Sequence, residues 1–145
     1  MKISRILITA LILICAIGIV SATDINKLQM PSDFTNAGGG TYANDPAGVE
    51  IDVYKDHATD FIKNDSSLKY TVVPGKIKNT FNFTDGTNNM TGIVEIVKID
   101  DKPVAITIWG DIGGKNTDLE KFTSQLEEVN KLNKLEPVDA STLWE

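Results

Sequence analysis

The chain has 145 residues, of which 41% are hydrophobic, 23% charged and 7% aromatic, and its formal net charge is −6 at pH 7. This length and composition fit one compact domain better than two. The acidic balance, with no cluster of Lys and Arg interleaved with aromatic residues, excludes nucleic acids and anionic membrane surfaces as expected partners.

The first 22 residues have the form of a signal peptide. Lys2 and Arg5 precede an apolar stretch over residues 6–20, and Ser21 and Ala22 supply the small residues that a signal peptidase reads. The stretch is shorter than the roughly 20 residues that a membrane-spanning helix needs, which favours cleavage after Ala22. The alternative is an uncleaved anchor, extended by Ser21 and Ala22. In both cases the rest of the chain is predicted to be secreted or at the cell surface, with membrane contact only through this segment.

Residues 23–145 are predicted to form a single exported domain. Removing residues 1–22 takes away two positive charges and no negative ones, so the body carries a formal charge of −8. The one cysteine, Cys15, lies in the removed segment, so no disulfide can hold the body together. A body of this length can instead rely on a hydrophobic core. Its tail from about residue 137 is expected to be loosely attached.

Hydrophobic periodicity predicts the main strands. In residues 49–54 and 81–84, apolar side chains occupy every second position, as in half-buried strands with one polar face. The segment 93–99 is apolar on both faces for much of its length, which indicates a central strand. Residues 104–109 are predicted to return antiparallel to it after a turn over Asp100–Pro103.

Shorter elements are predicted around these strands. Residues 34–44 include three consecutive glycines and are expected to form a short edge strand or a loop. Residues 70–73 are expected to form another strand. Asp56 is expected to cap a short helix in which Phe61 and Ile62 fall at helical spacing.

The closing segment is predicted to be an amphipathic helix from Thr117 to about Lys134. Thr117 and Glu120 have the spacing of a capping box. Apolar residues then recur along one stripe: Leu119, Phe122, Leu126, Val129 and Leu132. The predicted fold class is therefore α+β, a mostly antiparallel sheet of about four to six strands with a C-terminal amphipathic helix packed on one face.

The segment Gly110–Thr117 lies between a strand and a helix, as a phosphate-binding loop does. Its spacing fails, because Asn116 stands where Ser or Thr must reach a magnesium ion and Trp109 where a glycine is required. The glycines are interpreted as a tight turn into the helix. A weaker alternative is that free backbone donors near Thr117 attract an anion.

No catalytic or cofactor-binding residue is predicted. The single histidine, His57, has Asp56 and Asp60 close by in sequence, but no motif places a serine against it. It is interpreted as a solvated surface residue. Paired carboxylates could do glycosidase chemistry, but the aromatic residues needed to stack on sugars are few and mostly at core-patterned positions.

No metal site is predicted either. Asp85, Asn88 and Asn89 in one loop, and Asp100 with Asp101 in a turn, supply oxygen ligands. Neither group has the graded ligand spacing of a calcium loop. Zinc is less favoured still, because the exported body offers one histidine and no cysteine.

Three segments match the acceptor motif for N-linked glycans, with Asn64, Asn82 and Asn89 as the acceptors. In an exported protein these are candidate glycosylation sites, provided that the host has the transferase. Asn82 is expected to project from the face of its strand opposite Phe81 and Phe83, so a glycan there need not disturb the core.

The layout of the chain resembles that of small uncharacterised exported proteins of methanogenic archaea. The resemblance rests on the signal peptide, the Met30-Pro31-Ser32-Asp33-Phe34 opening, strands rich in Ile, Lys, Asn and Asp, and the closing helix. It covers most of the chain but is one of style, and it implies no activity, because those relatives carry none that could be transferred.

The expected function is that of a non-enzymatic extracytoplasmic binding or structural domain. Its partner would be a cell-envelope component or another exported protein, contacted through the outer sheet face and the loops at Gly38–Tyr42 and Asp85–Asn89. The alternative is a small extracellular hydrolase that uses paired carboxylates. A cavity holding two close carboxylates with perturbed titration would favour the hydrolase.

Overall fold

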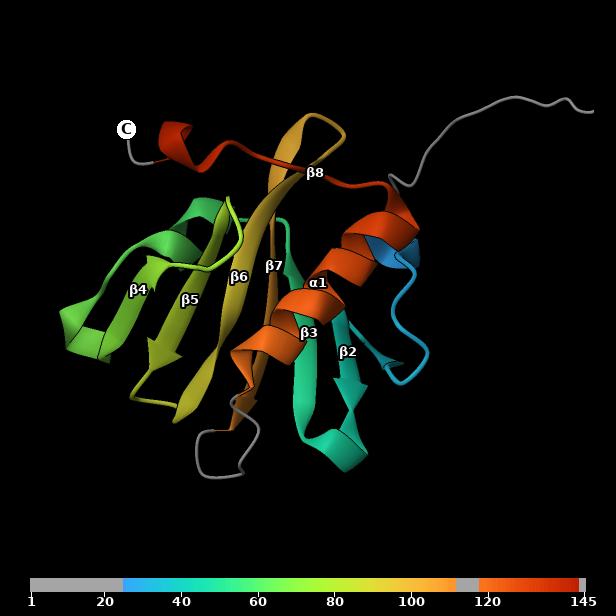
Figure 1. The fold of residues 1–145 in the computed structure, drawn as a ribbon, viewed down its shortest axis with the longest axis horizontal. Helices are drawn as coiled ribbons and strands as arrows, with labels where there is room; N and C mark the ends of the chain where they lie inside the picture. The colour runs from blue at the N-terminus through green and yellow to red at the C-terminus, as the bar shows by residue number, and fades with distance from the viewer. Residues whose placement is uncertain (1–24, 112–117, 144–145) are drawn as a thin grey trace, which may run out of the picture.

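A computed structural model describes residues 25–111 and 118–143 of the chain (Figure 1). Eight strands in this part form one antiparallel sheet, with the order β1-β2-β3-β7-β6-β5-β4 and β8 beside β6. The prediction of a mostly antiparallel sheet with a C-terminal helix is confirmed, but the sheet is larger than four to six strands. The predicted signal peptide lies outside the described residues.

The strands are β1 (Thr35–Gly38), β2 (Thr41–Asn44), β3 (Val49–Tyr54), β4 (Tyr70–Pro74), β5 (Thr80–Asp85), β6 (Met90–Ile99), β7 (Lys102–Asp111) and β8 (Glu136–Pro137). One α-helix, α1 (Leu119–Asn133), and the 3-10 helices η2 (Ile25–Lys27), η3 (Asp45–Ala47), η4 (Ala58–Ile62), η5 (Ser66–Leu68) and η7 (Ala140–Thr142) complete the described elements. Periodicity missed β8, because a two-residue strand is too short to show alternation.

The central hairpin pairs β6 with β7 over all ten residues of each strand. The predicted turn over Asp100–Pro103 is too long. Only Asp100 and Asp101 form it, and Lys102 already belongs to β7. Both turn residues have positive φ, 53° and 63°, as a two-residue type I′ turn requires. This tight turn allows the two longest strands to pair along their whole length.

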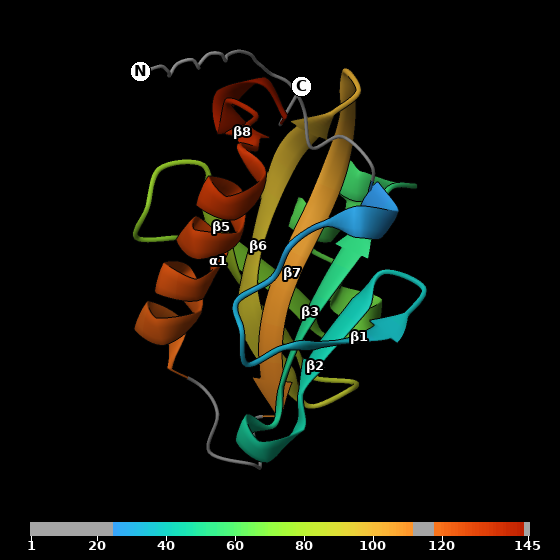
Figure 2. The same cartoon turned by 90° about the vertical axis from the view of Figure 1, so that its right-hand side faces the viewer.

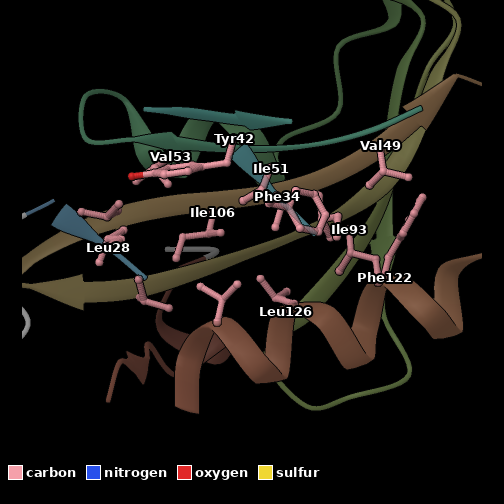
Figure 3. Close-up of a cluster of buried hydrophobic side chains, with 14 of the residues drawn as sticks. Leu28, Phe34, Tyr42, Val49, Ile51, Val53, Ile93, Ile106, Phe122 and Leu126 are labelled. Atoms are coloured by element: carbon pink, nitrogen blue, oxygen red, sulfur yellow. The ribbon is translucent and has the colours of Figure 1, made fainter. Parts of the chain in front are cut away.

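One face of the sheet, the front face, is crossed by α1 over β6 and β7 (Figures 1 and 2). Phe122, Leu126 and Val129 of the helix are buried in one cluster with strand residues such as Ile51 and Ile106 (Figure 3). The segment before β1 joins the same cluster through its own apolar side chains, Leu28 and Phe34. The core on this face is thus covered by the helix and by the N-terminal segment together.

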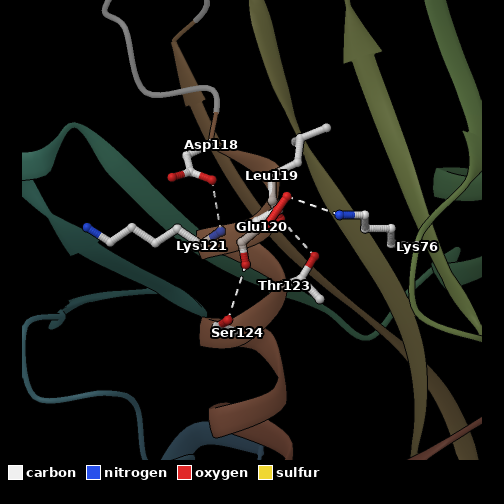
Figure 4. Close-up of polar contacts among 7 residues, drawn as sticks. All are labelled: Lys76, Asp118, Leu119, Glu120, Lys121, Thr123 and Ser124. Carbon is white, nitrogen blue, oxygen red and sulfur yellow. Dashed lines mark hydrogen bonds and ion pairs between the residues drawn. The ribbon is translucent and has the colours of Figure 1, made fainter.

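Two details of the predicted helix are wrong. Asp118, not Thr117, is the N-cap, and its side chain accepts a hydrogen bond from the Lys121 backbone N–H at 3.1 Å (Figure 4). Because the helix begins at Leu119, Glu120 is free to bind the Lys76 ammonium at 3.0 Å instead of closing a capping box (Figure 4). Thr117 itself lies outside the described residues.

The end of the apolar stripe also differs from the prediction. Leu132 is 41% exposed, whereas the next residue, Asn133, is 4% exposed. Asn133 lies four residues after the buried Val129 and returns to the helix face that meets the sheet. Leu132 lies three residues after Val129 and points away from that face. The buried stripe of α1 therefore ends on an amide.

The opposite face of the sheet, the back face, carries the second core cluster. Its centre is formed by Phe81, Phe83, Val94 and Ile96, with η4 packed over β6 and β7. The helix expected after Asp56 is a five-residue 3-10 helix whose N-cap is the next residue, and that residue makes no side-chain cap bond. The predicted cap is therefore wrong.

The C-terminal tail, expected to be loose, is attached to the sheet. β8 pairs with β6 beyond the end of β5, and the Val138 N–H donates to the Ile96 carbonyl at 2.8 Å. The Ala140 N–H donates to Asn79 Oδ1 at 2.9 Å. Leu143 packs against the back-face cluster. Long-range pairing of this kind leaves no local signal in the sequence.

Candidate functional site

Polar and aromatic side chains gather on the back face where β2, β3 and β7 lie side by side. We call this group the β3–β7 cluster: Thr41, Glu50, Asp52, Tyr54 and Trp109. Its β3 members alternate with residues that belong to the front-face core, so they point to the other face. Strand register aligns Glu50 with Trp109 and Asp52 with Thr41.

Asp52 is the centre of the cluster and is only 7% exposed. Its Oδ1 accepts a hydrogen bond from the Thr41 hydroxyl at 2.7 Å, and its Oδ2 accepts one from the Trp109 indole N–H at 2.7 Å. Two donors from two different strands thus satisfy a carboxylate that would otherwise be costly to bury. The network holds the indole in one orientation.

Glu50 lies half-buried two residues before Asp52 on the same face of β3. Its pKa is raised first by burial, then by the charge of Asp52, by a side-chain hydrogen bond with Asp52 and by the charge of Asp45. The two carboxyl groups therefore lie close together on one face of β3, where burial and mutual repulsion favour the protonated form of Glu50.

Trp109 occupies its place because its neighbour on β6 has no side chain. Gly92 is paired with Trp109 in the strand register. A Cβ at Gly92 would lie 2.6 Å from the Trp109 Cβ and 2.1 Å from the Ile108 carbonyl oxygen. Any other residue at position 92 would displace the strand or the indole. Trp109 itself stays half-buried, so part of its ring reaches the surface.

Tyr54 closes the cluster at the end of β3 and is 37% exposed. Its ring stacks on Phe61 of η4 with centroids 4.3 Å apart. Burial, and then the charges of Asp52 and Glu50, raise the pKa of Tyr54 to about 12. The phenol therefore stays protonated at neutral pH and can donate a hydrogen bond.

Two adjoining cavities lie beyond Tyr54, at the end of the sheet. The first, of about 350 Å³, is lined by Tyr54 and by Gly39 and Gly40 of the β1–β2 turn, among others. The second, of about 320 Å³, shares Lys55 and Asp56 with the first. The predicted contact loop at Gly38–Tyr42 therefore lies beside the β3–β7 cluster and supplies Thr41 to it.

The other predicted contact loop, at Asp85–Asn89, is held by hydrogen bonds between its own residues. Asp85 accepts from the backbone N–H groups of Thr87 at 2.9 Å and Asn88 at 3.0 Å, and from the Asn88 side chain at 2.9 Å. Burial raises the pKa of Asp85, but these bonds from Asn88 and Thr87 outweigh it and leave the pKa lowered. Its oxygens thus stabilise the loop rather than converge with Asn89 as metal ligands.

The remaining residues singled out in the sequence lie apart from the cluster. The His57 side chain is 85% exposed and its Nδ1 lies 3.5 Å from a carboxylate oxygen of Asp60. Asp100 and Asp101 are exposed in the hairpin turn. Within residues 25–111 and 118–143, no three or more His, Cys, Asp and Glu side chains are grouped so that they could hold a metal ion.

No helix in the described ranges is both long and apolar enough to cross a membrane. Of the three glycan acceptor motifs, Asn64 lies between η4 and η5, Asn82 lies within β5, and Asn89 ends the β5–β6 turn. The phosphate-loop pattern begins in β7 with Gly110, and its positions from 112 onwards lie outside the described residues.

Comparisons of the chain with protein-family models, with curated proteins and with solved structures found no match. The candidate site therefore rests on its own geometry. Sequence reasoning identified a polar face on residues 49–54 but did not connect it with Trp109. The missing information was the strand register, which brings together residues that are 57 positions apart.

Proposed function

We propose that the exported body is a non-enzymatic extracytoplasmic binding domain, and that the β3–β7 cluster binds a neutral glycan of the cell envelope. The observation that carries the proposal is a partly exposed indole held in place by a buried carboxylate, Trp109 on Asp52. Glu50, half-buried, is the partner of Trp109 in the strand register, and the phenol of Tyr54 lies farther along the same face of β3.

This combination suits sugars for two reasons. An aromatic ring offers an apolar face to the C–H groups of a pyranose, while carboxyl and phenol groups bond its hydroxyls. Because Trp109 is already fixed by Asp52 and Gly92, little side-chain freedom remains to be lost on binding. A formal charge of −8 on residues 23–145 disfavours polyanionic glycans, which leaves neutral ones as the favoured class.

A hydrolase is the second candidate, because the raised pKa of Glu50 beside another carboxyl is a feature of acid catalysts. The geometry argues against it. Glycoside hydrolysis uses two carboxyls about 5 to 10 Å apart, with the scissile bond or a water molecule between them. Asp52 is buried and both of its oxygens already accept hydrogen bonds, from Thr41 and Trp109, so its carboxyl is not open to a scissile bond or a water molecule.

The test is a calorimetric titration of the purified exported protein with neutral oligosaccharides of glucose, mannose and N-acetylglucosamine. We expect W109A to weaken binding at least about tenfold, or roughly 1.4 kcal/mol, and W109F to have an intermediate effect because it keeps a ring. E120Q, on α1 at the other face, is the matched control and should bind as the wild type does.

The same samples are assayed for sugar release. Binding by the wild type that is lost in W109A supports the proposal, provided that a melting curve shows W109A to be folded at the temperature of the titration. Equal affinity of W109A and the wild type, or no binding of any of these oligosaccharides, would overturn it. Sugar release that disappears in E50Q would establish the hydrolase instead.

A further inference from the structure

We infer that Asn64 is the glycan acceptor that this fold presents, so that the exported protein carries an N-linked glycan there. The inference depends on export and not on the proposed glycan-binding function. Transfer to an Asn-x-Ser/Thr motif needs an accessible amide nitrogen and an accessible hydroxyl two residues later. The three motifs of this chain differ sharply in these two respects.

Both groups are at the surface in the first motif. Asn64 and Ser66 are exposed, and Ser66 makes no side-chain hydrogen bond with any described residue. Asn64 Oδ1 accepts the Val72 backbone N–H at 2.6 Å, which holds the side-chain amide in one plane. Its Nδ2 is the other arm of that planar group, and no acceptor among the described residues binds it.

The other two motifs each lack one requirement. Asn82 is half-buried within β5, between Val73 on β4 and Ile93 on β6 in the strand register. Asn89 is exposed, but the hydroxyl of its motif belongs to Thr91, which is half-buried in β6 and donates to a backbone carbonyl at 3.1 Å. Only the Asn64 motif has its amide and its hydroxyl accessible together.

A glycan on Asn64 would also leave the pairing of the sheet unchanged. β4 is an edge strand, and the backbone N–H groups on its outer side are not available to another strand. Tyr70 pairs with Asp65 in both directions at 2.9 Å, the Val72 N–H is bound by Asn64, and Pro74 has no N–H. A glycan on Nδ2 would stand beside this closed edge.

The chemistry leaves the edge contact intact. The donor class is a polyprenyl-phosphate-linked oligosaccharide, supplied with its transferase by the host. The bond between the sugar C1 and the phosphate oxygen breaks, and a bond between C1 and Asn64 Nδ2 forms. One Nδ2 proton passes to a base of the transferase, and the polyprenyl phosphate leaves. Because Oδ1 takes no part, it can still accept the Val72 N–H.

The test is secretion of the full chain from a host that modifies Asn-x-Ser/Thr, with the protein collected from the medium so that every molecule has been exported. Intact mass and glycopeptide mapping should place a glycan on the peptide that contains Asn64. S66A should remove it without touching the bond from Asn64 to Val72, and S66T should retain it. T84A, which disables the Asn82 motif, is the matched control and should leave the mass of the attached glycan unchanged.

Melting curves of the variants are measured after the glycan is removed, so that differences in melting temperature report the substitution alone. We expect S66A to melt within the error of the wild type, because its hydroxyl has no partner in the described part of the chain. An unmodified Asn64 in the secreted protein would overturn the inference. So would a glycan on Asn82 or Asn89 that persists in S66A while the Asn64 peptide is bare.

Discussion

Asn133 near the end of α1 binds both backbone groups of Gln29, although 104 positions separate the two residues. Its Oδ1 accepts the Gln29 N–H at 2.7 Å, and its Nδ2 donates to the Gln29 carbonyl at 2.7 Å. The same Nδ2 donates to the Val129 carbonyl at 2.8 Å. A buried side-chain amide thus attaches the N-terminal segment to the helix by bonding both its N–H and its carbonyl, as the backbone of a neighbouring strand does.

Replacing this amide should loosen the N-terminal segment. We expect N133A to lower the free energy of unfolding by about 1–3 kcal/mol, because two backbone groups of Gln29 lose their partner in a partly buried place. Urea unfolding measures the change. Q29A is the matched control and should have little effect, since the bonds use only the backbone of that residue. Equal stability of N133A and Q29A would contradict the assignment.

The helix residues in the front-face core should carry much of its stability. Phe122 and Leu126 are each 1% exposed, so F122A and L126A should each cost roughly 2–5 kcal/mol. Leu132 is 41% exposed, and L132A should cost less than about 1 kcal/mol with the same change of side chain. A thermal melt unchanged by F122A or L126A would show that the helix does not lie where the structure places it.

A buried acid between β6 and α1 should make stability depend on pH. Glu95 is 3% exposed and accepts a hydrogen bond from Asn130. Burial raises the pKa of Glu95 to about 7, although the Asn130 bond lowers it, and the charge of Glu127 raises it further. Because the folded state holds the proton more tightly, the stabilisation is complete below about pH 4.5 and is lost as pH rises through 7.

E95Q should remove this dependence, because an amide of the same shape never ionises. We expect E95Q to be more stable than the wild type at pH 8 by up to about 3 kcal/mol, with a much smaller difference at pH 4. Chemical unfolding at the two pH values measures both. E127Q, an exposed neighbour on α1, should change the pH slope far less. A gain of equal size at pH 4 and pH 8 would contradict the raised pKa.

The hairpin turn offers a stabilising substitution. Asp101 has a φ of 63° at the second position of a type I′ turn, where glycine is strongly preferred. D101G should raise the free energy of unfolding by about 0.5–1 kcal/mol. The substitution removes the strain of an L residue in the left-handed region, and this gain is partly offset by the larger backbone entropy that glycine loses on folding. D33G is the control, because Asp33 is exposed and its φ is not positive. A loss of stability in D101G would mean that the turn is of another type.

Several elements could be predicted because their signal is local. The alternation in residues 49–54 and 81–84, and the two-sided apolar run over 93–99, correspond to β3, β5 and β6. Period two in a strand needs only a few neighbouring residues to be visible. The helix after position 117 is also predictable from a local signal, the spacing of its apolar residues along one stripe. Its N-cap and its last buried residue are not predictable in this way.

What the sequence by itself determined is the central strands and the C-terminal helix, and the face on which most of their apolar residues lie. The tertiary structure alone decided which strands are neighbours and in what register, and with that the meeting of Trp109, Asp52 and Thr41. It also attached the tail through β8 and paired Asn133 with Gln29. The physical reason is that periodicity records the burial of one side chain, whereas a pairing between distant segments depends on how the whole sheet is assembled.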